Sequence, residues 1–269
     1  MSLAAESLTL IRGGREVVSG LSAALHPGQI TAIVGPNGAG KSSLLLGLAG
    51  LLAPAGGTVV LDGVNVAGLN PRIRAQAIGY LPQTPDIAWD VAVETLVALG
   101  RLPWRDRGTE AVEAALAALD LEPLRQRPVS RLSGGERARV LLARVLAGGP
   151  RWILADEPLA ALDLAHQLGL IAHFKACARA GQGVVVVLHD LALAMNYADR
   201  VLVLKDGHLI ADGPPAEALA PQVIAQGWGV GARWLGEAGG LSETGVLGEA
   251  GGMALVAGPG PARTDQGFG

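Results

Sequence analysis

The sequence predicts an α/β protein whose core is a mostly parallel sheet, with antiparallel strands at the N-terminus and an inserted helical subdomain. Short apolar runs at 30–34, 152–155 and 184–188 are typical of strands buried on both faces of a parallel sheet. Helical patterns lie between these runs, and strands that alternate with helices favour a parallel arrangement. Residues from about 84 to 149 are mostly helical in pattern, so we expect them to form the inserted subdomain.

Turn residues and periodicity place the individual elements. Paired glycines or Asp-Gly between apolar runs are hairpin signals. Apolar residues that recur every three to four positions indicate an amphipathic helix. The expected elements are, in order, a hairpin of strands 8–11 and 15–18 around Gly13-Gly14, a strand at 30–34, a helix from Lys41 to about Leu52, a strand at 58–61, a helix at 110–120, strands at 152–155 and 184–188 on either side of a helix at 166–180, and a hairpin of 201–204 with 208–210 around Asp206-Gly207.

The composition changes near the C-terminus. After about residue 213 the chain becomes rich in Gly, Ala and Pro, and segment 235–240 is nearly repeated at 247–252. Two copies are too few for a solenoid. We therefore predict a main domain at 1–220, with 84–149 as its helical subdomain, and an appendage at 221–269. Whether this appendage is a small lobe or a flexible tail stays open.

Charge and composition exclude several classes of protein. The net charge of −3 gives no basic surplus of the kind that nucleic-acid binding usually requires. The lone cysteine, Cys177, is expected to be a small buried hydrophobe, which suits a reducing compartment. The N-terminus lacks a basic start followed by an apolar stretch, so we do not expect a signal peptide. No apolar run reaches the roughly 18 residues that a bilayer span needs, so any work at a membrane would require a partner.

A glycine-rich segment, 35–43, lies between a predicted strand and a predicted helix. Its residues, Gly-Pro-Asn-Gly-Ala-Gly-Lys-Ser-Ser, fit the phosphate-loop pattern in the required context and indicate a phosphate-loop NTPase core. Glycines allow backbone N–H groups to turn inward around phosphate oxygens, and the helix N-terminus adds partial positive charge. Lys41 is expected to reach the β- and γ-phosphates of ATP, and the Ser42 hydroxyl to bind Mg²⁺. The candidate ATP-binding residues are Gly35, Pro36, Asn37, Gly38, Ala39, Gly40, Lys41, Ser42 and Ser43.

Two adjacent carboxylates, Asp156 and Glu157, follow the buried strand 152–155. The carboxyl ends of parallel strands are where such sheets place ligands, and burying unpaired charge is costly, so this pair needs a functional reason. We expect Asp156 to hold Mg²⁺ and Glu157 to orient the attacking water.

A third motif is Leu132-Ser133-Gly134-Gly135-Glu136. Ser133 and Glu136 form a capping box that opens a helix. Two glycines in the first turn cost helix stability, and they are favourable where backbone N–H groups must approach a phosphate closely.

In this order and spacing, the motifs of roughly residues 1 to 220 resemble those of ATP-binding-cassette ATPases. Segment 132–136 is similar to the signature motif of that family, which contacts the nucleotide bound to the opposite subunit. The resemblance implies that Ser133, Gly134, Gly135 and Glu136 act in trans within a dimer of two copies. It also implies that Gln83 senses Mg²⁺, that Ala161-Leu162-Asp163 is the dimer-contact loop, and that His189 contacts the γ-phosphate. Lys41, Glu157 and His189 are then the expected catalytic residues, and Ser42, Gln83 and Asp156 the Mg²⁺ site.

The sequence departs from the family where adenine binds. The family usually stacks adenine on an aromatic residue upstream of the phosphate loop, but residues 1–34 contain no Phe, Tyr or Trp. A guanidinium plane can stack on a base, so we expect Arg12, or Ile11, to cover the adenine with weaker selectivity for ATP over GTP. Ser43 and Ala155 stand where Thr and a large apolar residue are more usual, and we expect neither to disable the site.

Segments 78–83 and 97–103 resemble the ATPase subunits of importers for iron–siderophore complexes, haem or cobalamin. Those importers show a similar Leu-Gly-Arg-x-Pro segment, here Leu99-Gly100-Arg101-Leu102-Pro103, in the region that docks on the permease. This implies transmembrane permease subunits as partners, a substrate-binding protein acting indirectly, and a peripheral place on the cytoplasmic face of the inner or plasma membrane. The alternatives are a soluble assembly ATPase of the iron–sulfur type and the motor of another transporter class.

Overall fold

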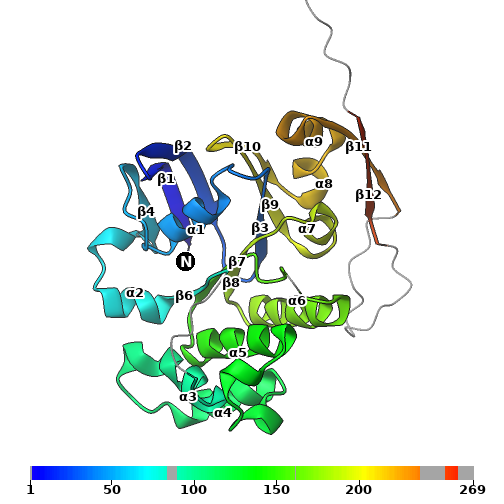
Figure 1. Cartoon of the computed structure of the whole chain (residues 1–269). Coiled ribbons are helices and arrows are strands. Elements are labelled where there is room, and N and C mark those ends of the chain that lie inside the picture. The colour runs from blue at the N-terminus through cyan, green and yellow to red at the C-terminus, as the bar shows by residue number, and fades with distance from the viewer. Residues whose placement is uncertain (1, 84–89, 161, 237–251, 260–269) are drawn as a thin grey trace, which may run out of the picture.

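The computed structural model describes residues 2–83, 90–160, 162–236 and 252–259 (Figure 1). Its centre is a 6-stranded sheet in the order β10-β9-β3-β8-β7-β6. These strands are β3 (Ile30–Val34), β6 (Ile78–Leu81), β7 (Trp152–Asp156), β8 (Gly183–Val187), β9 (Arg200–Lys205) and β10 (His208–Gly213). The pairs among β9, β3, β8, β7 and β6 are parallel, and only β10 in this sheet runs antiparallel to its neighbour. The predicted α/β class with a mostly parallel sheet is therefore confirmed.

The N-terminal strands form a separate antiparallel sheet. Its order is β2-β1-β4-β5, and its strands are β1 (Leu3–Arg12), β2 (Arg15–Leu25), β4 (Gly56–Leu61) and β5 (Val64–Asn65). The predicted hairpin is present, because Arg12 pairs with Arg15 across the Gly13-Gly14 turn. Both of these glycines have positive φ, which the tight turn requires.

Helices cover the central sheet and link its strands. The α-helices are α1 (Lys41–Leu48), α2 (Pro71–Ala77), α3 (Val93–Ala98), α4 (Thr109–Ala118), α5 (Gly134–Ala147), α6 (Leu164–Arg179), α7 (Leu191–Tyr197), α8 (Pro215–Ala218) and α9 (Pro221–Trp228). Short 3-10 helices are η1 (Val66–Gly68), η2 (Leu99–Trp104), η3 (Glu122–Leu124) and η4 (Val129–Arg131). None of the helices in the described ranges combines the length and hydropathy of a membrane span.

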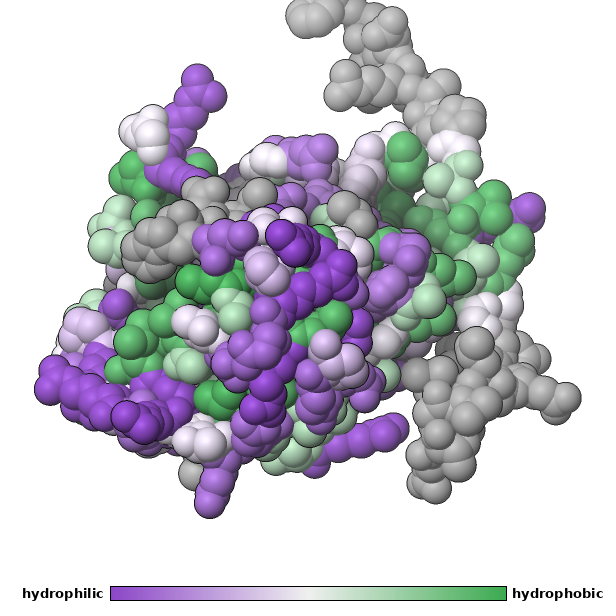
Figure 2. Space-filling view, turned by 60° about the horizontal axis from the view of Figure 1, so that its bottom comes forward, coloured by the Kyte–Doolittle hydropathy of each residue, from purple (hydrophilic) through white to green (hydrophobic). Residues whose placement is uncertain are grey.

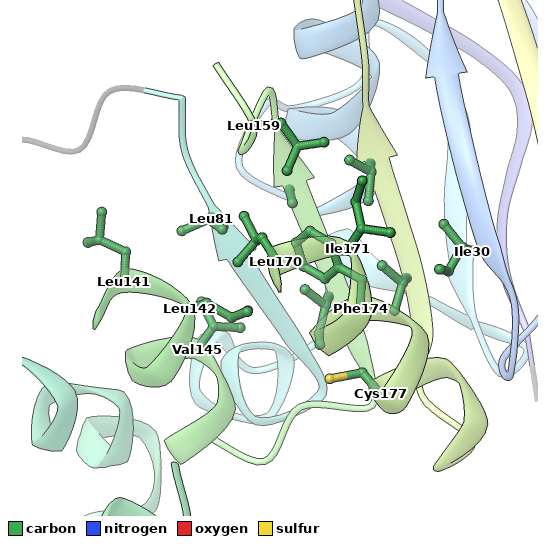
Figure 3. Close-up of a cluster of buried hydrophobic side chains, with 14 of the residues drawn as sticks. Ile30, Leu81, Leu141, Leu142, Val145, Leu159, Leu170, Ile171, Phe174 and Cys177 are labelled. Carbon is green, nitrogen blue, oxygen red and sulfur yellow. The ribbon is translucent and has the colours of Figure 1, made fainter. Parts of the chain in front are cut away.

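Two apolar clusters lie on opposite faces of the central sheet, because successive side chains of a strand point to opposite faces. Ile33 belongs to the cluster shared with α1 and the antiparallel sheet, whereas Ala32 and Val34 belong to the cluster under α5, α6 and α7. Figure 3 shows part of this second cluster, in which Leu142 and Val145 of α5 lie near Leu81 of β6. The helical subdomain is thereby packed against β6, the edge strand that leads to Gln83.

The helices α3, α4 and α5 gather at one end of the molecule, below the central sheet in Figure 1. Figure 2 brings this end forward and shows hydrophilic side chains interrupted by smaller apolar patches. The predicted stripe of segment 110–120 is buried through Val112, Ala115, Leu116 and Leu119. The start of the predicted subdomain, at residue 84, lies outside the described residues.

Packing continues past residue 220. Helix α9 lies against β9 and β10, and its Ile224 is buried. Beyond it, β11 (Val230–Leu235) pairs antiparallel with β12 (Ala254–Pro259). The Asn196 side chain of α7 connects this strand pair to the main domain. Its amide donates to the Met253 carbonyl at 2.9 Å and accepts from the Met253 N–H at 2.8 Å. The described part of the C-terminal segment is therefore attached to the main domain.

The predicted end of the first helix is wrong, and the two strands predicted at 8–11 and 15–18 are longer, at Leu3–Arg12 and Arg15–Leu25. The helix expected to reach Leu52 ends at Leu48. Gly50 adopts a left-handed backbone conformation with φ of 67°, and the N–H groups of Leu51 and Leu52 both donate to the Leu46 carbonyl, which closes the helix.

Candidate nucleotide-binding site

The phosphate loop leaves the C-terminal end of β3 and enters α1. Two of its glycines are required by close contacts as well as by backbone freedom. A Cβ on Gly40 would lie 2.2 Å from the Val17 carbonyl oxygen, and one on Gly35 would lie 2.1 Å from the Leu204 carbonyl oxygen. The loop is therefore fixed between β2 and β9.

Lys41 is the first residue of α1 and is buried, with 6% of its surface exposed. Its Nζ donates hydrogen bonds to the carbonyl oxygens of Gly35, at 2.8 Å, and Pro36, at 3.0 Å. Burial lowers the pKa of Lys41, and the nearby carboxylates of Glu157 and Asp156 oppose that shift. The arrangement holds an ammonium group at the loop, where phosphate oxygens would be neutralised.

Asp156 ends β7 and lies beside the phosphate loop. Its Oδ1 accepts a hydrogen bond from the Ser42 hydroxyl at 3.0 Å, and only 5% of the residue is exposed. Burial raises the pKa of Asp156, while the Ser42 hydrogen bond acts in the opposite direction. Tyr80, on the neighbouring strand β6, also bonds to this carboxylate, and burial is the main reason that the pKa of Tyr80 is raised to about 12.

Glu157 follows Asp156 in a left-handed backbone conformation with φ of 48°. Such a conformation is unfavourable for a non-glycine residue and is concentrated at functional sites. Gln83 donates from Nε2 to Glu157 Oε2 at 2.5 Å, and His189 Nε2 lies 2.5 Å from Glu157 Oε1. The direction of this carboxylate is thus fixed by the backbone of Glu157 itself and by the side chains of Gln83 and His189. The three residues follow β7, β6 and β8, respectively.

These groups surround a cavity of about 510 Å³, a volume within the usual range for small-molecule sites. It is lined by Arg12, Val17, Asn37, Gly38, Ala39, Gly40, Lys41, Ser42, Ser43, Gln83, Glu157 and His189. Of the residues predicted to bind ATP within one chain, Gly35 and Pro36 do not line the cavity but hold Lys41 through their carbonyl groups. The other residues predicted to bind ATP within one chain line this cavity together with Glu157 and His189, and Asp156 reaches it through its bond to Ser42.

The residues present fit a magnesium ion with phosphate oxygens. Ser42 and Asp156 offer a hydroxyl and a carboxylate 3.0 Å apart, and the Gln83 side chain reaches the same cavity. Mg²⁺ is usually held by one or two carboxylates together with substrate phosphates and water. In the described part of the chain there is no group of three or more His, Cys, Asp or Glu that could hold a metal.

The residues predicted to act in trans lie outside this cavity. Ser133 is exposed and caps α5, accepting from the Glu136 N–H at 3.3 Å, and its own N–H donates to Glu136 Oε2 at 2.7 Å. Gly134 lines a neighbouring cavity of about 230 Å³ together with Gln83 and Glu157. Asp163 caps α6 by accepting from the His166 N–H at 2.9 Å. Ala161, in the predicted dimer-contact loop, lies outside the described residues.

Sequence reasoning overlooked three features of this region. Val17 lines the main cavity, and nothing in its sequence context indicates that role. Tyr80 was assigned no function, although parallel pairing of β6 with β7 places it opposite Leu154, two positions from Asp156. A Cβ on Gly135 would lie 2.2 Å from Cδ2 of His166, so this glycine is required by packing within its own chain. The expectation that Arg12 or Ile11 covers adenine stays a prediction, with Arg12 in the cavity lining and Ile11 47% exposed.

Comparison with known proteins identifies the family. The model of the ABC transporter family matches residues 18–160. The chain is 46% identical over 228 residues to the hemin import ATP-binding protein HmuV of Streptomyces coelicolor, covering 83% of this chain and 81% of that protein. It is 45% identical over 236 residues to the HmuV protein of Pseudomonas fluorescens, covering 85% of this chain and 92% of that protein.

Solved structures agree with these relatives. A metal-chelate type ABC transporter in an inward-facing conformation matches with a TM-score of 0.80 at 25% identity, covering 95% of this chain and 97% of that chain. A dimeric ATP-binding cassette with bound ADP and phosphate matches with a TM-score of 0.71 at 27% identity, covering 79% of this chain and 98% of that chain. With its phosphate loop, acidic pair and capped glycine motif in place, the chain belongs to the ATP-binding-cassette family and is an ATPase of the ABC transporter type.

Proposed function

We propose that this chain is the ATP-hydrolysing, Mg²⁺-dependent subunit of an importer that carries haem across a membrane. The observation that carries this proposal is the 46% identity, over 83% of the chain, to a curated hemin import ATP-binding protein. The cavity supplies the chemistry, since a buried lysine, a hydroxyl–carboxylate pair and a positioned glutamate converge on one loop.

ATP binding would use the phosphate loop as a cradle. Backbone N–H groups of 37–43 and the Lys41 ammonium would contact the phosphate oxygens, and Arg12 would lie at the adenine end. Ser42 and Asp156 would hold Mg²⁺, with Gln83 contributing its side-chain oxygen. When bound, Mg²⁺ supplies charge neutralisation to the phosphate oxygens.

Hydrolysis would depend on Glu157. Its carboxylate would orient the attacking water and accept a proton from it, a role that positioned carboxylates fill in many enzymes. His189, 2.5 Å from the same carboxylate, would contact the γ-phosphate and so report its loss.

A second copy of the chain would complete each site. Ser133, Gly134, Gly135 and Glu136 lie at the exposed N-terminus of α5, where helix N–H groups attract anions, and Asp163 lies at the start of α6. ATP held between Lys41 of one copy and Ser133 of the other would favour the closed dimer by differential binding. The dimeric cassette with ADP and phosphate supports this arrangement.

Transport would require permease subunits, because the chain would act peripherally at the cytoplasmic face of the inner or plasma membrane. A groove of about 300 Å³ beside η2, with exposed Leu99 and Leu102 at its wall, is the docking site that we propose for the permease. A substrate-binding protein would act on the permease and contact this chain only indirectly.

The experiment that tests the proposal begins with the tagged chain, recovered from its native membranes in mild detergent. Membrane proteins retained with it are reconstituted in vesicles, and ATP-dependent uptake of haemin, a ferric siderophore and cobalamin is compared. The Glu157→Gln variant serves as the control that keeps the assembly and removes turnover. We expect haemin uptake that depends on ATP and is lost in Glu157→Gln.

Other outcomes are equally informative. Uptake of cobalamin or a ferric siderophore in place of haemin would contradict the cargo and leave the importer. Retention of water-soluble partners alone, with no membrane protein, would contradict the importer and favour an assembly ATPase.

A further inference from the structure

The groove beside η2 is formed by neighbouring segments that are distant in the sequence. One wall comes from α2 and β6, and the other from η2 and the last turn of α5. Its apolar lining includes Ile78, Leu99, Leu102, Pro103 and Val145. Leu99 and Leu102 of this lining are 38% and 69% exposed, and large apolar side chains gathered on one surface suit a site covered by a partner.

The wall formed by η2 is held rigidly. Arg101 donates to the Ala147 carbonyl at 3.1 Å and pairs with Asp106 at 2.7 Å. Trp104 donates from Nε1 to the Gly148 carbonyl at 2.8 Å, and the Arg101 guanidinium lies 4.9 Å from the Trp104 ring centroid. These bonds use the free carbonyl groups at the C-terminal end of α5. The groove is therefore preformed, and its position is tied to the helix that begins at the glycine motif.

Arg144 carries a charge that no contact among the described residues of the chain neutralises. It is half-buried in the last turn of α5 and is the one side chain with a full charge among the groove's lining residues. Burial lowers the pKa of Arg144. Within the described parts of the chain it has no hydrogen-bond or ion-pair partner, whereas Arg101 has Asp106 and Arg200 has Asp212.

A partner that covers the groove would remove the water that still solvates this guanidinium. Burying an unpaired charge is strongly unfavourable, so a segment binds in the groove only if it supplies an anionic group. Proximity to the C-terminal end of α5 favours a cation there, but it does not replace the lost hydration of the guanidinium face. A carboxylate matches the fork of N–H donors in arginine and is the usual protein group that does so.

We propose that the permease segment seated in this groove presents an Asp or Glu side chain to Arg144, and that this pair selects the partner. The inference rests on the importer function proposed above and adds the chemistry of the contact. Contact with Leu99 and Leu102 would bury apolar surface. The buried charge pair would distinguish the correct partner from others, since a neutral or basic segment would leave Arg144 unpaired.

The test measures binding of the chain to its permease, isolated as described above and held in lipid nanodiscs. Arg144→Met keeps the apolar stem and removes the charge, and Arg144→Glu reverses it. Arg107→Glu, on the nearby exposed loop and outside the groove lining, is the matched control for a change in net charge. The thermal midpoint and basal ATPase activity of each isolated variant verify folding.

We expect half-saturation of the permease to require at least tenfold more Arg144→Met than wild-type chain, and Arg144→Glu to bind more weakly still. Arg107→Glu should stay within about twofold of wild type, on the scale of an exposed surface charge. The Asp and Glu residues in the permease's cytoplasmic loops are then replaced by Lys, one at a time. One of these replacements should restore the binding of Arg144→Glu to the permease.

Four results would overturn the proposal. Wild-type affinity in Arg144→Met would remove Arg144 from recognition while leaving the importer function intact. Equal losses in Arg107→Glu and Arg144→Glu would reduce the effect to general electrostatics. If the Arg144 variants lost the self-association of the wild-type chain in the absence of permease, the groove would be assigned to a second copy of the chain. If the wild-type chain bound no permease at all, the importer function would fail first, and this assignment with it.

Discussion

The imidazole Nε2 of His189 lies 2.5 Å from Oε1 of Glu157, on the opposite side of that carboxylate from Gln83. The two residues come from loops after different strands, and Glu157 is only 12% exposed between them. Each carboxylate oxygen can accept more than one hydrogen bond, so these contacts fix the carboxylate without exhausting its acceptors. The carboxylate is thus held in one direction between two residues that also line the nucleotide cavity, as the general-base role that we propose for it would require.

The first prediction concerns this carboxylate. Glu157→Gln should keep the shape of the side chain and remove its ability to accept a proton. We expect turnover to fall by at least about 100-fold, the lower range for loss of a general base, with ATP affinity within about threefold of wild type. Phosphate release and nucleotide binding measure the two effects. Size-exclusion chromatography with ATP should reveal a stable dimer, and rapid turnover by this variant would remove Glu157 from catalysis.

The second prediction concerns Arg12 and the choice of base. A guanidinium stacks on any purine, whereas an aromatic ring restores the stacking surface typical of the family. We expect GTP to compete with ATP more effectively in the wild-type chain than in Arg12→Tyr, by a few-fold in the ratio of inhibition constants. Arg15→Tyr, an exposed position on the next strand, is the control. Equal competition by GTP in wild type and Arg12→Tyr would exclude Arg12 as the adenine contact.

Local patterns were sufficient to predict much of this fold. The glycine-rich loop between a strand and a helix, and the acidic pair at the end of a buried strand, both carry their structural context in adjacent residues. Continuous apolar runs at 30–34 and 184–188 predicted two-sided burial, which Ile33 and Val34 show by joining opposite clusters. Each of these inferences needs only a few neighbouring residues.

Contacts between distant segments could not be predicted in the same way. Gln83 and Glu157 are 74 positions apart, and their hydrogen bond depends on the pairing of β6 with β7. Packing of Gly135 on His166 depends on how α5 and α6 meet, which no local pattern encodes. The pairing of Leu235 with Ala254 crosses the Gly-rich segment, so composition alone left lobe and tail unresolved.

The third prediction is a pH dependence at the start of α5. The hydrogen bond from the Ser133 N–H is the main reason that the pKa of Glu136 is lowered. A carboxyl with a lowered folded pKa stabilises the protein above its unfolded value, near 4.5, and this stability is lost as pH falls through the folded pKa. We expect the free energy of unfolding of the wild type to exceed that of Glu136→Gln by about 0.5–1 kcal/mol at pH 7, a typical value for an acidic residue in the first turn of a helix. The difference should shrink on acidification, as measured by urea unfolding at pH 7 and pH 3, and a constant difference would contradict the assignment.

The fourth prediction compares two glycines that differ in their surroundings. A Cβ on Gly183, which begins buried strand β8, would lie 2.3 Å from the Trp152 ring, so Gly183→Ala must displace a fully packed indole. Overpacking of this kind costs about 1–3 kcal/mol. Gly169 is exposed within α6 and has nothing near its Cβ position, so Gly169→Ala should stabilise the helix by about 0.5–1 kcal/mol. Urea unfolding of both variants measures these opposite shifts. Equal stability of Gly183→Ala and wild type would mean that β8 and Trp152 can separate without loss of packing, contrary to the close contact between them.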